Sequence, residues 1–207
     1  WTTRIGITGP PEILTYEDIN GYHQKESIHA DYKTAVVNGR KLYVGNIKQD
    51  GIVYGDRMIK SPVNEFDVTP EKRIVDVAVQ DGDDIIALHE YADRILQFKR
   101  KKVYIINVAG ESEFLEDTLD FQGITNPGAV CRTSQGIAWV NNNGVYLYNG
   151  QDVIDLTIKA GQRQIEWLPG SGGSSVENWT SGSTTDNRLI GYIPDKKQIV
   201  LFQSGTG

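Results

Sequence analysis

The stretch Asp84-Ile85-Ile86-Ala87-Leu88-His89-Glu90-Tyr91-Ala92-Asp93-Arg94-Ile95-Leu96-Gln97-Phe98 decides the fold. Two apolar runs, 85–88 and 95–98, flank a short polar segment at 91–93. Short runs of β-branched and aromatic residues bounded by turn residues are typical of β-strands. This pattern therefore predicts two antiparallel strands joined by a tight turn. The basic segment 99–102 then leads to a further strand at 103–108.

The same apolar–turn–apolar unit occurs elsewhere in the chain. Its second strands begin at Leu42, Ile95, Ile137 and Ile199. The intervals are 53, 42 and 62 residues, and the last contains a Gly/Ser/Thr-rich stretch at 170–185. Without an inserted loop of that length, the last interval would resemble the other two. Asn141-Asn142-Asn143-Gly144 is a further turn signal, because Asn and Gly tolerate the positive φ of tight hairpins.

The repeat predicts an all-β fold built from blades of antiparallel strands. Periods of about 40 to 50 residues suit a β-propeller with four strands per blade. A β-sandwich would also contain short strands and hairpins, but it need not repeat this unit. We expect a lead-in segment at 1–33 with a short helix near 11–20, and a partial propeller at 34–207 with an inserted loop at 170–185. Because the chain starts at Trp1 and its only methionine is Met58, we expect a segment of a longer chain.

Composition limits the possible chemistry. Lys and Arg total 21 and Asp and Glu total 27, so the net charge is −6, which argues against tight nonspecific binding of nucleic acid. A single cysteine, Cys131, excludes a disulfide framework or a Cys-based zinc site within the chain, and is expected to be a small buried hydrophobe. The three histidines are scattered. No apolar run approaches the ~20 residues that span a bilayer, so no membrane segment is predicted.

Catalytic motifs are absent. The sequence contains no Gly-x-Ser-x-Gly elbow, phosphate-binding loop or His-Glu-x-x-His motif. Asp81-Gly82-Asp83-Asp84 is the densest acidic cluster, but the places at which an EF-hand needs Gly and an acid hold Ile86 and Ala92. The cluster is better interpreted as a turn before a strand. We predict no catalytic, cofactor-binding or metal-binding residues, and no enzyme activity.

Two surface features are candidate contacts. Lys99, Arg100, Lys101 and Lys102 could touch DNA phosphates if their turn faces a channel, although a solvated hairpin tip is the simpler interpretation. Trp179 lies in the 170–185 loop and is the candidate for ligand contact. It also belongs to an N-glycosylation sequon that begins at Asn178 and matters only in a secreted protein. Three other aromatic residues are expected to pack in the core instead: Trp139, Tyr146 and Tyr148.

A family resemblance is carried by the segments 32–46, 56–62, 64–67, 81–88 with 93–99, and 136–139 with 144–150. These segments resemble tail proteins of double-stranded DNA bacteriophages. The resemblance covers about residues 32 to 157. It implies a virion structural protein, most similar to the tail nozzle of short-tailed phages. Such nozzles form rings below the portal and adaptor, line the DNA exit channel and carry propellers on the outside.

From this resemblance we expect a non-enzymatic homo-oligomeric ring in the virion tail, assembled in the host cytoplasm and used in DNA ejection. Its expected partners are the portal or adaptor, tail fibres and, transiently, genome DNA. One alternative is a tail-tip propeller that binds host-surface glycans, for which Trp179 is the candidate residue. A second alternative is a propeller glycosidase, which would need two carboxylates facing one cleft.

Overall fold

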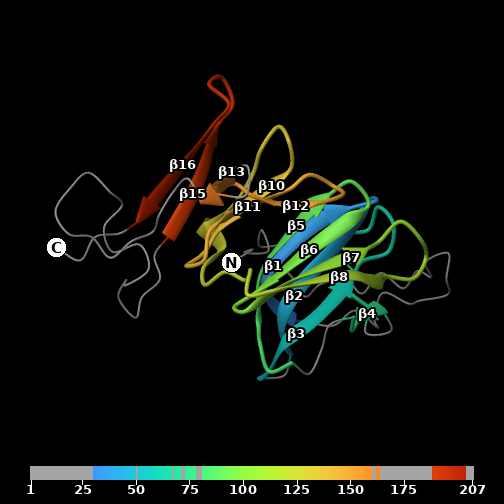
Figure 1. Ribbon diagram of the computed structural model, residues 1–207. Coiled ribbons are helices and arrows are strands. Elements are labelled where there is room, and N and C mark those ends of the chain that lie inside the picture. Colours follow the sequence, from blue (N-terminus) through green and yellow to red (C-terminus); the bar gives the residue numbers. More distant parts are fainter. Residues whose placement is uncertain are drawn as a thin grey trace, which may run out of the picture. The chain divides into compact units, whose positions relative to one another are not determined.

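The computed structural model describes residues 30–49, 51–66, 68–70, 73–77, 81–159, 162–163 and 188–203. This part of the chain is all-β and consists of antiparallel sheets, with a short 3-10 helix, η3 (Pro127–Ala129), and no α-helix (Figure 1). The predicted fold class is confirmed at this level. The expected helix at 11–20 and the expected loop at 170–185 lie outside the described residues.

The first sheet is a meander with the strand order β1-β2-β3-β4. The strands are β1 (Ala30–Asn38), β2 (Lys41–Gln49), β3 (Ile52–Lys60) and β4 (Ile74–Val75). Gly39 and Arg40 connect the first two strands with φ angles of 55° and 60°. Positive φ at both central residues is the mark of the hairpin turn that matches strand twist. Because β1 begins at Ala30, residues 30–33 belong to this sheet and not to a lead-in segment.

The second sheet repeats the same plan, with the order β5-β6-β7-β8. Its strands are β5 (Ile85–Tyr91), β6 (Arg94–Lys99), β7 (Lys102–Asn107) and β8 (Phe114–Asp120). The strands β6 and β7 are almost wholly buried, whereas β8 is an exposed edge strand. The two apolar runs at 85–88 and 95–98 therefore lie in the first hairpin of this sheet, as predicted.

The third sheet is again a meander of consecutive strands, whose neighbours pair antiparallel. Its strands are β9 (Val130–Arg132), β10 (Ile137–Val140), β11 (Val145–Tyr148) and β12 (Val153–Asp155). Two hairpins follow it in the described chain: β13 (Ile158–Lys159) with β14 (Gln162–Arg163), and β15 (Arg188–Ile193) with β16 (Gln198–Gln203).

All four predicted apolar–turn–apolar units are hairpins of consecutive strands. They are β1–β2, β5–β6, β9–β10 and β15–β16. In each of the four-stranded sheets of the described chain, the unit supplies the first two strands, and two more strands complete the meander. No closed ring of sheets is detected among the described residues.

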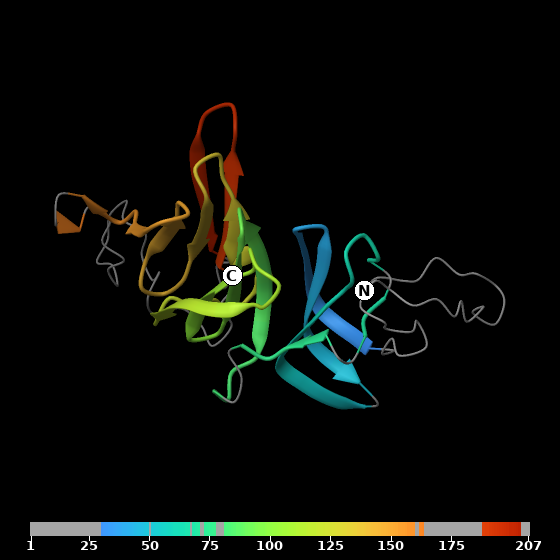
Figure 2. The ribbon, with the colours of Figure 1, turned by 90° about the vertical axis from the view of Figure 1, so that its right-hand side faces the viewer.

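The chain divides into two compact units. The first contains Trp1–Gln97 and Tyr104–Thr118, and the second contains Phe98–Val103 and Leu119–Gly207. In the first unit, β1 and β2 pack against β5 (Figure 2). Side chains of these strands join one apolar cluster. Its buried members are Tyr43, Met58, Val75, Ile85, Leu88, Ile95, Tyr104, Ile106 and Val108.

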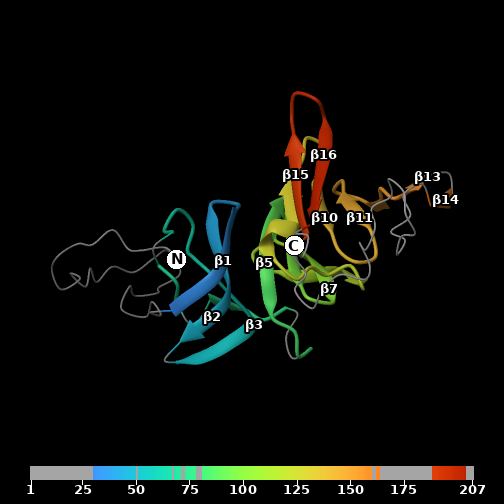
Figure 3. The same cartoon turned by 90° about the vertical axis from the view of Figure 1, so that its left-hand side faces the viewer.

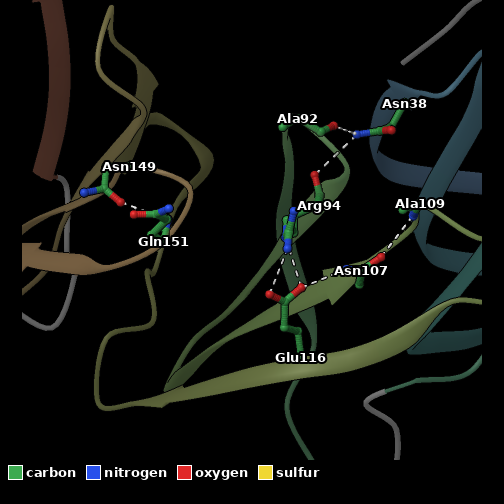
Figure 4. A network of polar contacts seen from close by, with 8 residues as sticks. All are labelled: Asn38, Ala92, Arg94, Asn107, Ala109, Glu116, Asn149 and Gln151. Carbon is green, nitrogen blue, oxygen red and sulfur yellow. Dashed lines mark hydrogen bonds and ion pairs between the residues drawn. The ribbon is translucent and has the colours of Figure 1, made fainter.

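Polar contacts in the first unit join β1 to the β5–β6 turn and connect β6, β7 and β8 (Figure 4). The Nδ2 of Asn38, at the end of β1, donates to the carbonyl oxygen of Ala92 at 2.7 Å. Nearby, the guanidinium of Arg94 forms two 3.0 Å contacts with the carboxylate of Glu116. The Nδ2 of Asn107 donates to the same carboxylate at 3.0 Å. These two hydrogen-bonding groups lower the pKa of Glu116, with the guanidinium of Arg94 as the larger cause.

In the second unit, β15 packs against β9, β10 and η3 (Figure 3). The hydroxyl groups of Ser134, in the turn between β9 and β10, and Tyr192, in β15, are 2.7 Å apart. The first strand of one sheet therefore lies beside the first strand of another in this unit, as β1 lies beside β5 in the first unit.

Candidate functional site

The four residues of the basic run, 99–102, differ in how far the fold exposes them. The side chain of Lys99 is fully buried, so it does not reach the surface as a contact. Lys102 is half-buried and its Nζ lies 3.0 Å from Oδ1 of Asp120. Arg100 and Lys101 are exposed at the turn between β6 and β7. Of the four predicted contact residues, these two form the exposed basic surface.

An open pocket of about 210 Å³ lies beside this turn, and we call it the hairpin-tip pocket. Its lining comes from the β6–β7 turn, the segment after β8 and the β10–β11 turn. The lining residues are Arg100, Lys101, Phe121, Gly123, Thr125, Asn141, Asn142 and Asn143. Both turn signals of the sequence, the basic run and the asparagine run, therefore meet at one site in the second unit.

Asn141 holds the pocket together. It is buried, and its Nδ2 donates to the carbonyl oxygens of Phe121 and Gly123, both at 3.0 Å. Its Oδ1 accepts from the backbone N–H groups of Asn143 at 2.7 Å and Gly144 at 3.2 Å. One amide thus closes the β10–β11 turn and fixes the segment after β8. Buried polar groups are stable only when hydrogen-bonded, and this side chain uses both its donor and its acceptor.

Phe121 is the exposed aromatic residue of the pocket. Its side chain is 79% exposed and its φ is 62°, in the left-handed region that non-glycine residues rarely adopt. Its carbonyl oxygen accepts from Nδ2 of Asn143 at 2.9 Å as well as from Asn141. The surrounding hydrogen bonds therefore hold Phe121 in an unfavourable backbone conformation that presents its ring to solvent.

The floor beneath this segment is aromatic. Trp139 is fully buried, lies edge-on to Phe98 at 5.4 Å between ring centroids and stacks on Tyr146 at 5.5 Å. The indole Nε1 of Trp139 donates to the carbonyl oxygen of Gln122 at 2.8 Å. The prediction that Trp139, Tyr146 and Tyr148 pack in the core is confirmed, since all three are buried.

Close backbone contact completes the pocket. The amide of Ile124 donates to the carbonyl oxygen of Lys99 at 2.9 Å. At Gly123 a Cβ would lie 2.4 Å from that same oxygen and 2.5 Å from backbone atoms of Arg100. Only glycine, which has no Cβ, can lie this close to the backbone of Lys99 and Arg100. On the other side, the guanidinium of the buried Arg188 contacts Oδ1 of Asn142, which fixes the side chain of Asn142 at the pocket.

The acidic cluster before β5 is a bend, as expected. Gly82 has a φ of 72°, and Oδ1 of Asp81 accepts from the amide of Asp83 at 3.1 Å. The other carboxylate oxygen of Asp81 accepts from the hydroxyl of Tyr104 at 2.7 Å. Over the described residues, no group of three or more His, Cys, Asp or Glu side chains is placed to hold a metal ion.

Three further residues were singled out in the sequence: Trp179, Asn178 and Cys131. Trp179 and Asn178 lie outside the described residues. Cys131 is half-buried rather than fully buried, and burial raises the pKa of its thiol to about 11. Such a thiol is a poor nucleophile at neutral pH, because the reactive species is the thiolate.

A second polar group, in the first unit, has no signal in the sequence. The Nζ of Lys60 lies 2.7 Å from Oε2 of Glu113, and both side chains are largely buried. The hydroxyl of Tyr43 donates to Oε1 of Glu113 at 3.0 Å. Burial and the nearby carboxylate of Glu113 raise the pKa of Tyr43 well above its usual range. The three residues come from β2, β3 and the segment before β8, so the group is a structural connection between strands.

No protein-family model matches the chain, and no curated protein matches its sequence. In the part of the chain that the structure describes, no helix combines the length and apolar character needed to cross a membrane.

Proposed function

We propose that the chain is part of a β-propeller in a structural protein of a phage tail, a nozzle-type ring component around the DNA exit channel. The observation that carries the propeller is the repetition of four-stranded meanders that all begin with the same kind of hairpin. The packing of β1 on β5 and of β9 on β15 supports it, because the blades of a propeller are placed side by side around an axis.

The tail assignment rests on the resemblance of residues 32–157 to phage tail proteins. The protein would then be located in the virion tail, with the portal or adaptor, fibres and passing genome DNA as its partners. Its mechanism would be assembly into a ring.

The test is to purify virions of the phage whose genome encodes the chain, and to examine them by mass spectrometry and cryo-electron microscopy. We expect the protein in the particle and its density as propellers outside a ring at the tail. Absence from the particle would overturn the tail assignment. Density at the tail without blades of four strands would overturn the propeller alone.

A glycan-binding tail-tip propeller is a second candidate, and the hairpin-tip pocket favours it over a glycosidase. Hydrolysis of a glycosidic bond needs two carboxylates at one cleft. The lining of this pocket contains no Asp or Glu. This pocket therefore lacks the pair of carboxylates that cleavage of a glycosidic bond would need.

A further inference from the structure

We propose that the hairpin-tip pocket binds one acidic sugar residue of a larger saccharide. The pyranose ring would stack on Phe121, and its carboxylate or phosphate would pair with Arg100 and Lys101. This inference does not depend on the proposed tail function, because it concerns one site in the second unit.

Phe121 has the features of a binding platform. It is the most exposed of the large hydrophobic side chains described, at 79%. Its backbone is held in the left-handed region by donors from Asn141 and Asn143. A residue kept in an unfavourable conformation by its surroundings is a reason to seek a functional role. A backbone fixed in this way loses little freedom when a flat apolar sugar face stacks on the ring that it carries.

The charge of the pocket selects an anion. Arg100 and Lys101 both line it, whereas no acidic side chain does, in a chain of net charge −6. Arginine and lysine bind carboxylates and phosphates through charge-assisted hydrogen bonds. The local positive surface is therefore opposite in sign to the chain as a whole.

A single anionic ring fits better than a nucleic acid. Lys99 is buried and Lys102 is only partly exposed, so Arg100 and Lys101 are the fully exposed cations of the run. Nucleic-acid affinity depends on neutralising several phosphates, and a duplex hides the base faces on which an aromatic side chain could stack. Two exposed cations beside the ring of Phe121 match a ligand that carries one anionic group beside one sugar ring.

The size and the amides of the pocket agree with a sugar. Its volume of about 210 Å³ is below the ~300 Å³ at which pockets for drug-sized ligands begin. Asn142 and Asn143 are exposed at its rim. Because Oδ1 of Asn142 contacts Arg188 and Nδ2 of Asn143 donates to Phe121, the donor of Asn142 and the acceptor of Asn143 are the groups offered to sugar hydroxyls.

The test begins with an array of acidic oligosaccharides containing uronic acid, sialic acid or sugar phosphate, each beside its neutral counterpart. Acidic saccharides that bind are then titrated against the chain by NMR, together with inorganic phosphate and a dT8 oligonucleotide. We expect acidic saccharides to bind at least about tenfold more tightly than their neutral counterparts and than phosphate alone. The uronic acid and sugar phosphate arms show which anionic group is preferred.

Matched variants connect binding to the pocket. Phe121→Asn removes the ring but keeps a residue that tolerates positive φ, and we expect affinity to fall about tenfold or more. Phe66→Asn, at another exposed phenylalanine, is its control. Arg100→Gln with Lys101→Gln should abolish the preference for acidic saccharides. Lys33→Gln with Lys196→Gln removes the same charge at exposed positions elsewhere and should preserve the preference.

Thermal unfolding of each variant confirms that it is folded. Three results would overturn the proposal: no binding across the acidic members of the array, equal binding of neutral counterparts, or binding unaffected by the pocket variants. Tighter binding of dT8 that the pocket variants abolish would also overturn it, and would assign the pocket to single-stranded nucleic acid.

Discussion

The side-chain amide of Asn141 donates to the carbonyl oxygen of Phe121 at 3.0 Å, 20 residues earlier in the chain. Because the same amide reaches Gly123 and its oxygen closes the β10–β11 turn, one buried side chain controls both walls of the hairpin-tip pocket.

Asn141→Asp therefore tests this connection. The variant keeps the oxygen that closes the turn, but it loses the donor and places a buried carboxylate against two carbonyl oxygens. We expect a loss of about 2 to 4 kcal/mol in the free energy of unfolding, measured by urea denaturation.

The matched control is Asn149→Asp. Asn149 is exposed, and its Oδ1 accepts from the amide of Gln151 at 2.9 Å (Figure 4). The same oxygen accepts from the amide of Asp152 at 2.8 Å. Aspartate retains this acceptor, so we expect a change within about 0.5 kcal/mol. Equal effects of the two substitutions would show that the donor contacts of Asn141 contribute no stability.

Gly123→Ala tests the close backbone approach. Its Cβ would meet backbone atoms of Lys99 and Arg100 at 2.4 to 2.5 Å, and backbone cannot move aside as a side chain can. We expect a destabilisation of about 1 to 3 kcal/mol. Gly191→Ala is the control, because a Cβ there meets nothing within 4 Å. A neutral Gly123→Ala would mean that the turn between β6 and β7 shifts freely.

The first hairpin of each four-stranded sheet could be predicted from sequence because apolar runs flank a polar turn. The outer strand β8 could not, since Phe114–Asp120 is an exposed edge whose acidic residues give no apolar pattern. The hairpin-tip pocket could not be predicted from the sequence either. The basic run marks only its own turn, and nothing in the sequence shows that Phe121 would be held beside Asn141.

Because of Tyr43, we expect the free energy of unfolding to change with pH in the alkaline range. Its burial, together with Glu113, raises the pKa of its phenol in the folded state above the unfolded value of about 10. The neutral phenol therefore stabilises the fold below pH 10, and this contribution is lost as pH rises above 10.

We expect Tyr43→Phe to lower the free energy of unfolding by about 1 to 3 kcal/mol at pH 7, since the hydroxyl donates to a carboxylate. The difference between wild type and variant should narrow between pH 9 and pH 11, measured by urea denaturation at each pH. A difference that stays constant over this range would contradict the raised pKa.

Cys131 should react slowly while the protein is folded. Because burial raises the pKa of its thiol to about 11, the thiolate fraction at pH 8 is small. We expect reaction with a disulfide reagent to be about a hundredfold slower than for a free cysteine, and to reach the normal rate in urea. A normal rate in the folded protein would show that the thiol is open to solvent.

We expect Phe121 to lower the free energy of unfolding relative to glycine at the same position. Its φ of 62° disfavours any residue with a Cβ, and its ring is too exposed to contribute much packing. We expect Phe121→Gly to raise the free energy of unfolding by about 0.5 to 1 kcal/mol, whereas Phe121→Ala gains nothing because alanine is strained there as well. Urea denaturation of both variants measures this difference. A loss of stability in Phe121→Gly would mean that the ring stabilises the fold, and would remove the reason to regard it as displayed for a ligand.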